Sequence, residues 1–220
     1  MKLFDNAETP DVVYCDNHLL IVTKPCGWLT QPNGMGGPDL EAFAKAWVKK
    51  EFNKPGDVFL HCIHRLDKPV FGLVLFAKTS KALSRLNALS REGKIHRAYL
   101  AEVEGIVPNK EGTLEHFLVH GDFRAILAKA SDKEAKRSML HYSVVSIREH
   151  STLVKVVLET GRYHQIRAQF SAIGHPVLGD EKYGSSSETG ECIHLACTDI
   201  AFAHPVTHEE IRLHWDAPFE

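Results

Sequence analysis

Two short stretches of the sequence gather the side-chain types that carry out acid–base and nucleophilic chemistry. The first, His64-Arg65-Leu66-Asp67, lies between two apolar runs and is followed by Pro69 and Gly72, residue types that fix turns. A carboxylate held beside an arginine and a histidine can act as a nucleophile or as a general base. The plainer interpretation is that Asp67 caps or pairs within its own loop.

The second stretch is Gly161-Arg162-Tyr163-His164-Gln165-Ile166-Arg167, which directly follows an expected strand and opens an expected helix. It offers several hydrogen-bond donors in one place with a helix N-terminus behind them, a combination that suits phosphate or carboxylate groups. A capped and solvated first helical turn is the alternative interpretation.

A metal-dependent hydrolase is a third interpretation, because His61, His64 and Asp67 are spaced by three residues. Zinc sites of this kind need a third strong protein ligand and a hydrogen-bonding partner for each histidine, and the sequence points to neither. We therefore expect no metal.

With two further segments, these stretches closely resemble the RluA-type pseudouridine synthase family. The further segments are Arg97-Ala98-Tyr99-Leu100-Ala101-Glu102-Val103-Glu104-Gly105 and Gly174-His175-Pro176-Val177-Leu178-Gly179-Asp180-Glu181-Lys182-Tyr183-Gly184. All four stand in the family's order, which makes a chance match very improbable. The resemblance implies an isomerase that converts a uridine in ribosomal or transfer RNA to pseudouridine after flipping it out of the stack, with no cofactor.

The resemblance also implies roles for particular residues. Asp67 matches the catalytic aspartate, as nucleophile or as base, and Tyr99 matches the tyrosine that lines the site against the target base. Arg167 matches the basic residue that pairs with the aspartate; a guanidinium in contact favours the ionised form of a carboxylate. The expected substrate-binding residues are His64, Arg65, Arg162, His164 and Gln165.

One departure from the family pattern lies beside the expected catalytic loop. After Lys68-Pro69 the family usually has Thr-Ser-Gly, whereas this chain has Val70 and Phe71 before Gly72. The loss of both hydroxyls supports an alternative function, a catalytically silent RNA-binding module with the same fold.

The composition is typical of a soluble globular protein and gives no indication of RNA binding. The 220 residues are 44% hydrophobic and 25% charged, and 26 basic residues face 28 acidic ones. This excludes a disordered chain or a coiled coil, and it gives no basic excess. Basic residues do gather between residues 78 and 97, where Lys78, Lys81 and Arg85 could hold phosphates; a solvated face explains the same charges.

Partners and location follow from what the sequence lacks. No apolar run is long enough for a membrane span, the first ten residues show no signal peptide, and the five cysteines contain no CxxC pair. We expect a cytoplasmic monomer and no membrane, and the resemblance implies structured RNA as its partner. Residues 1–220 are expected to be a single catalytic domain, without the N-terminal RNA-binding domain of many relatives.

Hydrophobic periodicity predicts more strands than helices, many of them linked as hairpins. The expected fold is α+β, a mixed and mostly antiparallel β-sheet with flanking helices, which is the pseudouridine synthase fold. Residues 112–133 are expected to be surface loops. Strands are predicted at 12–14, 19–23, 58–63, 72–77, 97–104, 139–147, 153–160, 192–202 and 211–215, and helices after Asp39, from 79 or 80 to Gly93, and over 162–173.

Overall fold

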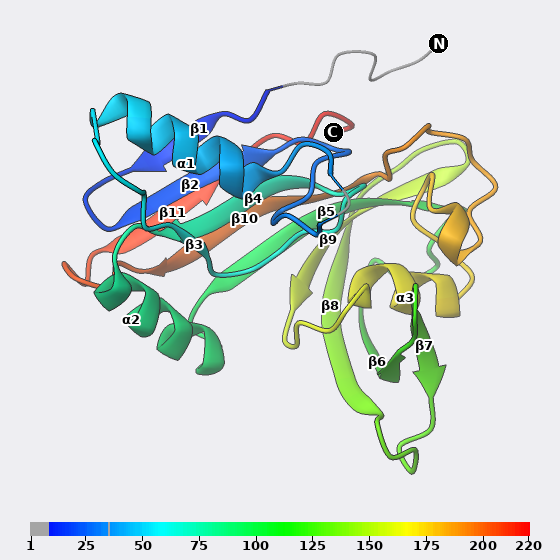
Figure 1. The fold of residues 1–220 in the computed structure, drawn as a ribbon. Coiled ribbons are helices and arrows are strands. Elements are labelled where there is room, and N and C mark those ends of the chain that lie inside the picture. The colour runs from blue at the N-terminus through cyan, green and yellow to red at the C-terminus, as the bar shows by residue number, and fades with distance from the viewer. Residues whose placement is uncertain (1–8, 35) are drawn as a thin grey trace. The chain divides into compact units, whose positions relative to one another are not determined.

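The computed structural model describes residues 9–34 and 36–220, and the chain divides into two compact units (Figure 1). Among the described residues, the N-terminal unit holds 9–34, 36–96 and 197–217, and the central unit holds 97–196 and 218–220. Most of the central unit, residues 97–196, is thus inserted into the sequence of the N-terminal unit, and residues 218–220 follow that unit.

The N-terminal unit contains a sheet in the order β1-β2-β4-β10, with β3 paired to β4 and β11 paired to β10. The pairs β1–β2, β2–β4, β3–β4 and β10–β11 are antiparallel. Both faces of β2 and β4 are buried, which explains why most residues in these two strands are apolar. The strands are β1 Val12–Cys15, β2 Leu19–Lys24, β3 His61–Cys62, β4 Phe71–Ala77, β10 Leu195–Ala203, which enters this unit at Cys197, and β11 Glu210–His214.

Two capped helices complete this unit. Asp39 accepts a hydrogen bond from the Ala42 amide at 2.8 Å and starts α1 (Leu40–Glu51). Thr79 accepts one from the Ala82 amide at 3.2 Å and starts α2 (Ser80–Arg91). Short polar side chains at this position satisfy amides that the helix itself leaves without a partner, so both predicted helix starts are confirmed. The apolar side of α2 packs with β2, β4, β10 and β11 in one core, made of Leu19, Ile21, Leu73, Leu75, Ala77, Ala82, Leu86, Ile200, Phe202 and Ile211.

The strand predicted over 58–63 is mostly wrong. The strand β3 contains only His61 and Cys62, which lie opposite Ala77 and Phe76 of β4. The sequence before them is apolar because Leu60 is buried, and burial of a loop residue mimics the pattern of a strand.

The central unit contains the strand order β5-β9-β8-β6-β7. Neighbouring strands are antiparallel throughout this series. The helix α3 (Gln165–Ala172) packs on β6 and β7, as Figure 1 shows. The other elements are β5 His96–Glu104, β6 Glu111–His120, β7 Ala125–Ala128, β8 Lys136–Ile147, β9 Ser151–Leu158 and the single 3₁₀ turn Glu181–Tyr183.

Two predictions for the central unit are corrected. Residues 112–133 are mostly not loops, because they contain most of β6 and all of β7, joined as a hairpin. The helix predicted from Arg162 starts three residues later, at Gln165, because His164 has a left-handed backbone with φ 51° and ψ 27°. A residue in that conformation cannot belong to a right-handed helix.

A buried carboxylate ties the chain end to the central unit. Glu102 accepts hydrogen bonds from Ser151 Oγ at 2.5 Å and His194 Nδ1 at 2.7 Å, and its Oε2 lies 2.8 Å from Arg148 Nη1. The His194 ring stacks on Phe219 at a centroid distance of 4.9 Å, and Arg148 donates to the Phe219 carbonyl.

The observed class is the predicted one, α+β with largely antiparallel strands and flanking helices. Within residues 9–34 and 36–220, no helix has the length and apolar character needed to span a membrane.

Candidate active site

The Asp67 turn in the N-terminal unit is held from its first residue. Leu66, which precedes the aspartate, is buried, and its amide donates to Thr30 Oγ1 at 3.0 Å. The same hydroxyl donates to the Leu66 carbonyl at 2.9 Å. The Val70 amide then donates to the Asp67 carbonyl at 3.0 Å, which closes the turn. The half-buried carboxyl of Asp67 therefore stands on a backbone fixed on both sides.

A buried lysine fixes the other end of this turn. Lys24 ends β2, is 0% exposed, and donates from Nζ to the carbonyls of Pro25, Trp28 and Lys68 at 2.8–3.1 Å. Its burial lowers the Lys24 pKa to about 7, while the charge of Asp67 acts in the opposite direction and raises it. Three carbonyl acceptors match the three donors of an ammonium group, and these hydrogen bonds join the segment after β2 to the Asp67 turn.

His64 and Arg65 lie in the same loop but differ in their surroundings. His64 is half-buried, and its Nε2 accepts the Leu75 amide of β4 at 3.3 Å. The imidazole therefore helps to attach the loop to the sheet. Arg65 is exposed, as a residue expected to meet RNA should be.

The residues that replace the family's two hydroxyls point into the core. Val70 is 2% exposed and Phe71 is 5% exposed, so the substitution exchanges polar groups for packed apolar ones. Gly72 follows with φ +114°, and a Cβ built on it would lie 2.6 Å from the backbone nitrogen of Cys197 in β10. Only glycine fits both this conformation and this close approach.

Tyr99 lies on β5 of the central unit. It pairs opposite Val156 of β9, and it is 6% exposed. The strand therefore gives Tyr99 a fixed backbone within this unit.

Arg167 is a buried arginine on α3 that contacts Asp180 and His164 in its own unit. Its Nε and Nη2 donate to the two carboxylate oxygens of Asp180 at 2.6 and 2.8 Å. Its Nη1 lies 3.0 Å from Nε2 of His164. Arg167 is 4% exposed and Asp180 is 1% exposed, so this fork-to-fork pair is shielded from water.

The cluster around Arg167 extends to Tyr183. The Tyr183 hydroxyl lies 2.9 Å from His164 Nδ1 and accepts the Ala125 amide at the start of β7 at 2.7 Å. Burial, followed by the charge of Arg167, lowers the His164 pKa to about 3. Burial also raises the Tyr183 pKa to about 12. Both side chains are therefore neutral over the physiological pH range.

Of the remaining expected substrate-binding residues of the central unit, Gln165 is buried and Arg162 is exposed. Gln165 is 3% exposed; its Oε1 accepts from Thr160 Oγ1 and the Arg162 amide, and its Nε2 donates to the Met139 carbonyl. These bonds join α3 to β8. Arg162 is exposed and donates from Nε to the Arg137 carbonyl at 3.1 Å.

The basic segment after β4 exposes fewer positive charges than its sequence indicates, because Lys78 is buried. Lys78 is 7% exposed; it donates to the Asp16 carbonyl, lies 3.2 Å from Cys15 Sγ, and its ammonium is 4.2 Å from the Phe52 ring centroid. The expectation that Lys78 holds a phosphate is therefore wrong. Lys81 is exposed, and Arg85, also exposed, donates to the Pro205 carbonyl at 2.6 Å.

Four residues of these clusters were not singled out from the sequence: Lys24, Thr30, Asp180 and Tyr183. Asp180 and Tyr183 lie within the segment 174–184 that carries the resemblance, but the sequence alone predicts no role for either residue. Nothing in the residue spacing could pair Thr30 with Leu66, since that contact joins two loops.

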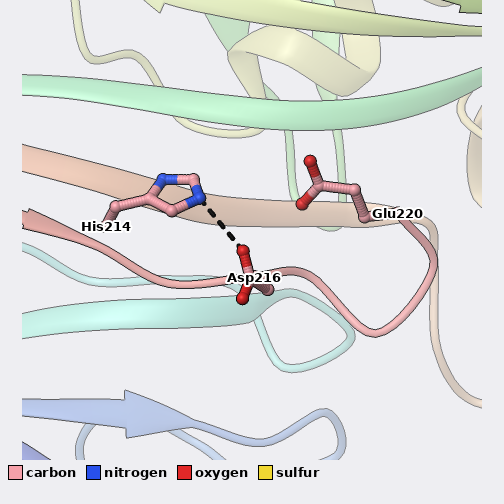
Figure 2. Close-up of side chains that lie close together, drawn as sticks. All are labelled: His214, Asp216 and Glu220. Carbon is pink, nitrogen blue, oxygen red and sulfur yellow. Dashed lines mark hydrogen bonds and ion pairs between the residues drawn. The ribbon is translucent and has the colours of Figure 1, made fainter.

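A surface histidine at the end of β11 has two carboxylate neighbours. His214 Nδ1 lies 3.0 Å from Asp199 Oδ1, and His214 Nε2 lies 3.2 Å from Asp216 Oδ1. Figure 2 shows the second contact and also draws Glu220, which belongs to the central unit. Both contacts are surface ion pairs, and the hydrogen bond to Asp199 raises the His214 pKa.

Known proteins resemble this chain in both sequence and fold. It is 31% identical to ribosomal large subunit pseudouridine synthase D of Zymomonas mobilis, over 94% of this chain and 69% of that protein. It is 30% identical to the dual-specificity RNA pseudouridine synthase RluA of Vibrio cholerae, over 90% of this chain and 79% of that protein. Human RNA pseudouridylate synthase domain containing 4 has the same fold, with a TM-score of 0.78 at 20% identity over 94% of this chain and 88% of the human one.

The fold is therefore that of a pseudouridine synthase. The family model for RNA pseudouridylate synthases matches residues 18–172, more than half of the chain, and the chain belongs to that family. The expected class of enzyme, an RNA isomerase, is confirmed by this membership.

Proposed function

We propose that this chain converts a specific uridine to pseudouridine in ribosomal RNA, transfer RNA or both. The named substrates of its relatives support this range, since one acts on the large ribosomal subunit, one is dual-specific, and a 28% identical protein of Yersinia pestis is named tRNA pseudouridine synthase C.

The reaction moves one glycosidic bond and needs no external reactant. The bond between ribose C1′ and uracil N1 breaks, and a new bond forms between C1′ and uracil C5. The hydrogen on C5 leaves as a proton to solvent, and N1 gains one. The atoms balance without an oxidant or reductant, in keeping with the expectation that no cofactor takes part.

The observation that carries the proposal is the placement of Asp67. Its half-buried carboxyl stands on a turn that Thr30 and Lys24 clamp from two sides. Fixed geometry of this kind is what a group that attacks C1′, or removes a proton from the ribose, requires. The two roles of Asp67 remain alternatives within the proposal.

Tyr99 and Arg167 are assigned to the same reaction. The buried ring of Tyr99 offers a flat face to the flipped uracil and a hydroxyl at its edge. Arg167 supplies a permanent positive charge that stabilises the catalytic carboxylate. We assign RNA contact to the exposed side chains of Arg65, Arg162 and Lys81.

The hydrogen bonds of the other expected substrate-binding residues support a different role for them. His64, His164 and Gln165 each use ring or amide atoms to hold a neighbouring segment in place. We propose that they position the loop, the arginine and α3, respectively. Residues 1–220 are proposed to act as one catalytic domain, because the family match takes in parts of both units. We further propose a cytoplasmic monomer.

Tritium release tests the reaction and the residue together. RNA labelled with tritium at uridine C5, as separate transfer and ribosomal pools without the modification, is incubated with wild type, Asp67→Asn and Asp57→Asn. Asp57 is an exposed aspartate of the same unit and serves as the matched control. Release by wild type and Asp57→Asn but not by Asp67→Asn supports the proposal, and the responding pool names the substrate class.

The silent RNA-binding module is the competing function, and Val70 and Phe71 are its support. It predicts salt-dependent RNA binding by wild type with no tritium release from either pool. Full release by Asp67→Asn would instead overturn the assigned mechanism.

A further inference from the structure

We propose that Asp180, His164 and Tyr183 form a positioning network that fixes the guanidinium of Arg167 for catalysis. All four side chains belong to the central unit and are at most 8% exposed. The inference rests on the proposed role of Arg167, and it adds positioning residues to that role.

Asp180 sets the plane of the guanidinium. Both carboxylate oxygens accept from it, at 2.6 and 2.8 Å, so the side chain of Arg167 has one orientation about its last bond. Asp180 is itself held by its backbone, since its carbonyl accepts the amides of Tyr183 and Ser185. The pair therefore has little freedom to shift.

His164 is a neutral acceptor for the same guanidinium. Arginine only donates, so His164 Nε2 must accept at 3.0 Å, and the ring hydrogen must then be on Nδ1. Burial and the adjacent positive charge of Arg167 both oppose a second proton. The backbone at residue 164 is left-handed, which is a strained conformation for a residue other than glycine.

Tyr183 fixes the ring of His164. Its hydroxyl oxygen accepts both His164 Nδ1–H at 2.9 Å and the Ala125 amide at 2.7 Å. The Arg167 Cζ also lies 5.0 Å from the Tyr183 ring centroid. One side chain thus connects the backbone of β7, the imidazole and the arginine.

These contacts engage three N–H groups of the guanidinium. Two of them point to Asp180 and one points to His164. The network therefore determines the position and the plane of the positive charge of Arg167.

The test removes one hydroxyl. Tyr183→Phe keeps the ring but deletes the acceptor of His164, and a misplacement of about 1 Å can lower a rate on the order of a hundredfold. We expect kcat to fall by about tenfold to a hundredfold, with KM within about twofold. Tyr142→Phe is the matched control, since Tyr142 is a buried tyrosine of β8 in the same unit and lies outside the network.

A double-mutant cycle separates positioning from general damage. In an Arg167→Lys background the fork is absent, so Tyr183→Phe should have no further effect on the single-turnover rate. An equal loss of rate in both backgrounds would mean that Tyr183 acts on something other than Arg167, and the inference would be wrong.

A second pair of variants covers the case in which Tyr183→Phe does not fold. His164→Gln keeps an acceptor near the position of Nε2, whereas His164→Leu does not, and both carry the same backbone strain. We expect the Gln variant to retain at least about tenfold more kcat than the Leu variant. Equal rates for two folded variants would overturn the inference.

The same data keep this inference separate from the proposed function. If wild type forms no pseudouridine, the proposed function fails. If wild type is active, Arg167→Lys is impaired, and Tyr183→Phe and the His164 pair behave like wild type, only the positioning network fails.

Discussion

The hydroxyl of Thr30 and the backbone of Leu66 hydrogen-bond each other twice, once in each direction. The Leu66 amide donates to Thr30 Oγ1 at 3.0 Å, and that hydroxyl donates to the Leu66 carbonyl at 2.9 Å. A side chain 36 residues earlier in the sequence thereby satisfies both backbone groups of the residue before Asp67. This fixes the direction in which the aspartate leaves the chain.

Thr30→Val should weaken the N-terminal unit and slow catalysis. The substitution keeps the shape but leaves a buried amide and a buried carbonyl without partners, at about 1–3 kcal/mol each. We expect urea unfolding to show a loss of this order, while Thr30→Ser stays close to wild type. Equal stability of the Val and Ser variants would show that the double hydrogen bond contributes nothing.

Gly72→Ala should prevent correct folding of the sheet that carries the Asp67 turn. The added Cβ would lie 2.6 Å from the Cys197 nitrogen, in the backbone of the neighbouring strand, which cannot give way cheaply. Gly174→Ala is the control: its φ is +82°, but no atom lies within 4 Å of the added Cβ. We expect a loss of more than about 4 kcal/mol for Gly72→Ala and about 1 kcal/mol for Gly174→Ala, measured by chemical denaturation.

Acid should destabilise the central unit through Glu102. Burial alone would raise the Glu102 pKa, but hydrogen bonds from His194 and Ser151 and the charge of Arg148 outweigh it and lower the pKa to about 2. A folded-state pKa below the unfolded one gives stability that is complete above about pH 4.5 and is lost as the pH falls toward 2. The contribution is at most about 3 kcal/mol.

The matched variant for this acid dependence is Glu102→Gln. It has no carboxylate to protonate, so its stability should be lower at pH 7 and should fall less between pH 4.5 and pH 2 than that of wild type. Parallel stability curves for the two proteins over this range would contradict the assignment.

His164 should remain neutral as the pH is lowered through the range in which surface histidines titrate. Its pKa is about 3, lowered by burial and by Arg167, whereas the pKa of His214 is raised by its hydrogen bond to Asp199. Imidazole NMR signals followed from pH 8 to pH 5, assigned with the variants His164→Gln and His214→Gln, should show a titrating His214 and a constant His164. A midpoint above pH 5 for His164 would refute the neutral acceptor.

The sequence predicts well those helices and strands whose pattern lies in their own residues or directly before them. Asp39 and Thr79 cap helices where the sequence places a short polar side chain before an apolar stripe. The alternating or fully apolar runs of β2, β4 and β9 were recognised because their own residues carry the pattern. The hairpin β6–β7 is not predicted, because few of its residues are buried and two of its apolar residues, Ile126 and Leu127, are exposed.

The sequence predicts which residues form the candidate site, but it does not predict the contacts that hold them in place. The residue types at Asp67, Tyr99 and Arg167 and their order along the chain carried the resemblance. The carbonyls that hold Lys24 and the partners of Arg167 depend on tertiary packing, which no spacing encodes. His164 looked like a substrate ligand because its neighbours are polar, and its left-handed backbone and burial became visible only in the structure.

The order of the units along the chain has a consequence for biosynthesis. Strands β1, β2 and β4 leave the ribosome before the central unit, but β10 and β11, which complete their sheet, follow it. A nascent chain that ends near residue 190 therefore exposes the edge of β4 that β10 will cover, and an uncovered strand edge is a site for aberrant pairing with other chains. Synthesis that stalls in this interval should yield a species that depends on chaperones, although most of the central unit is already present.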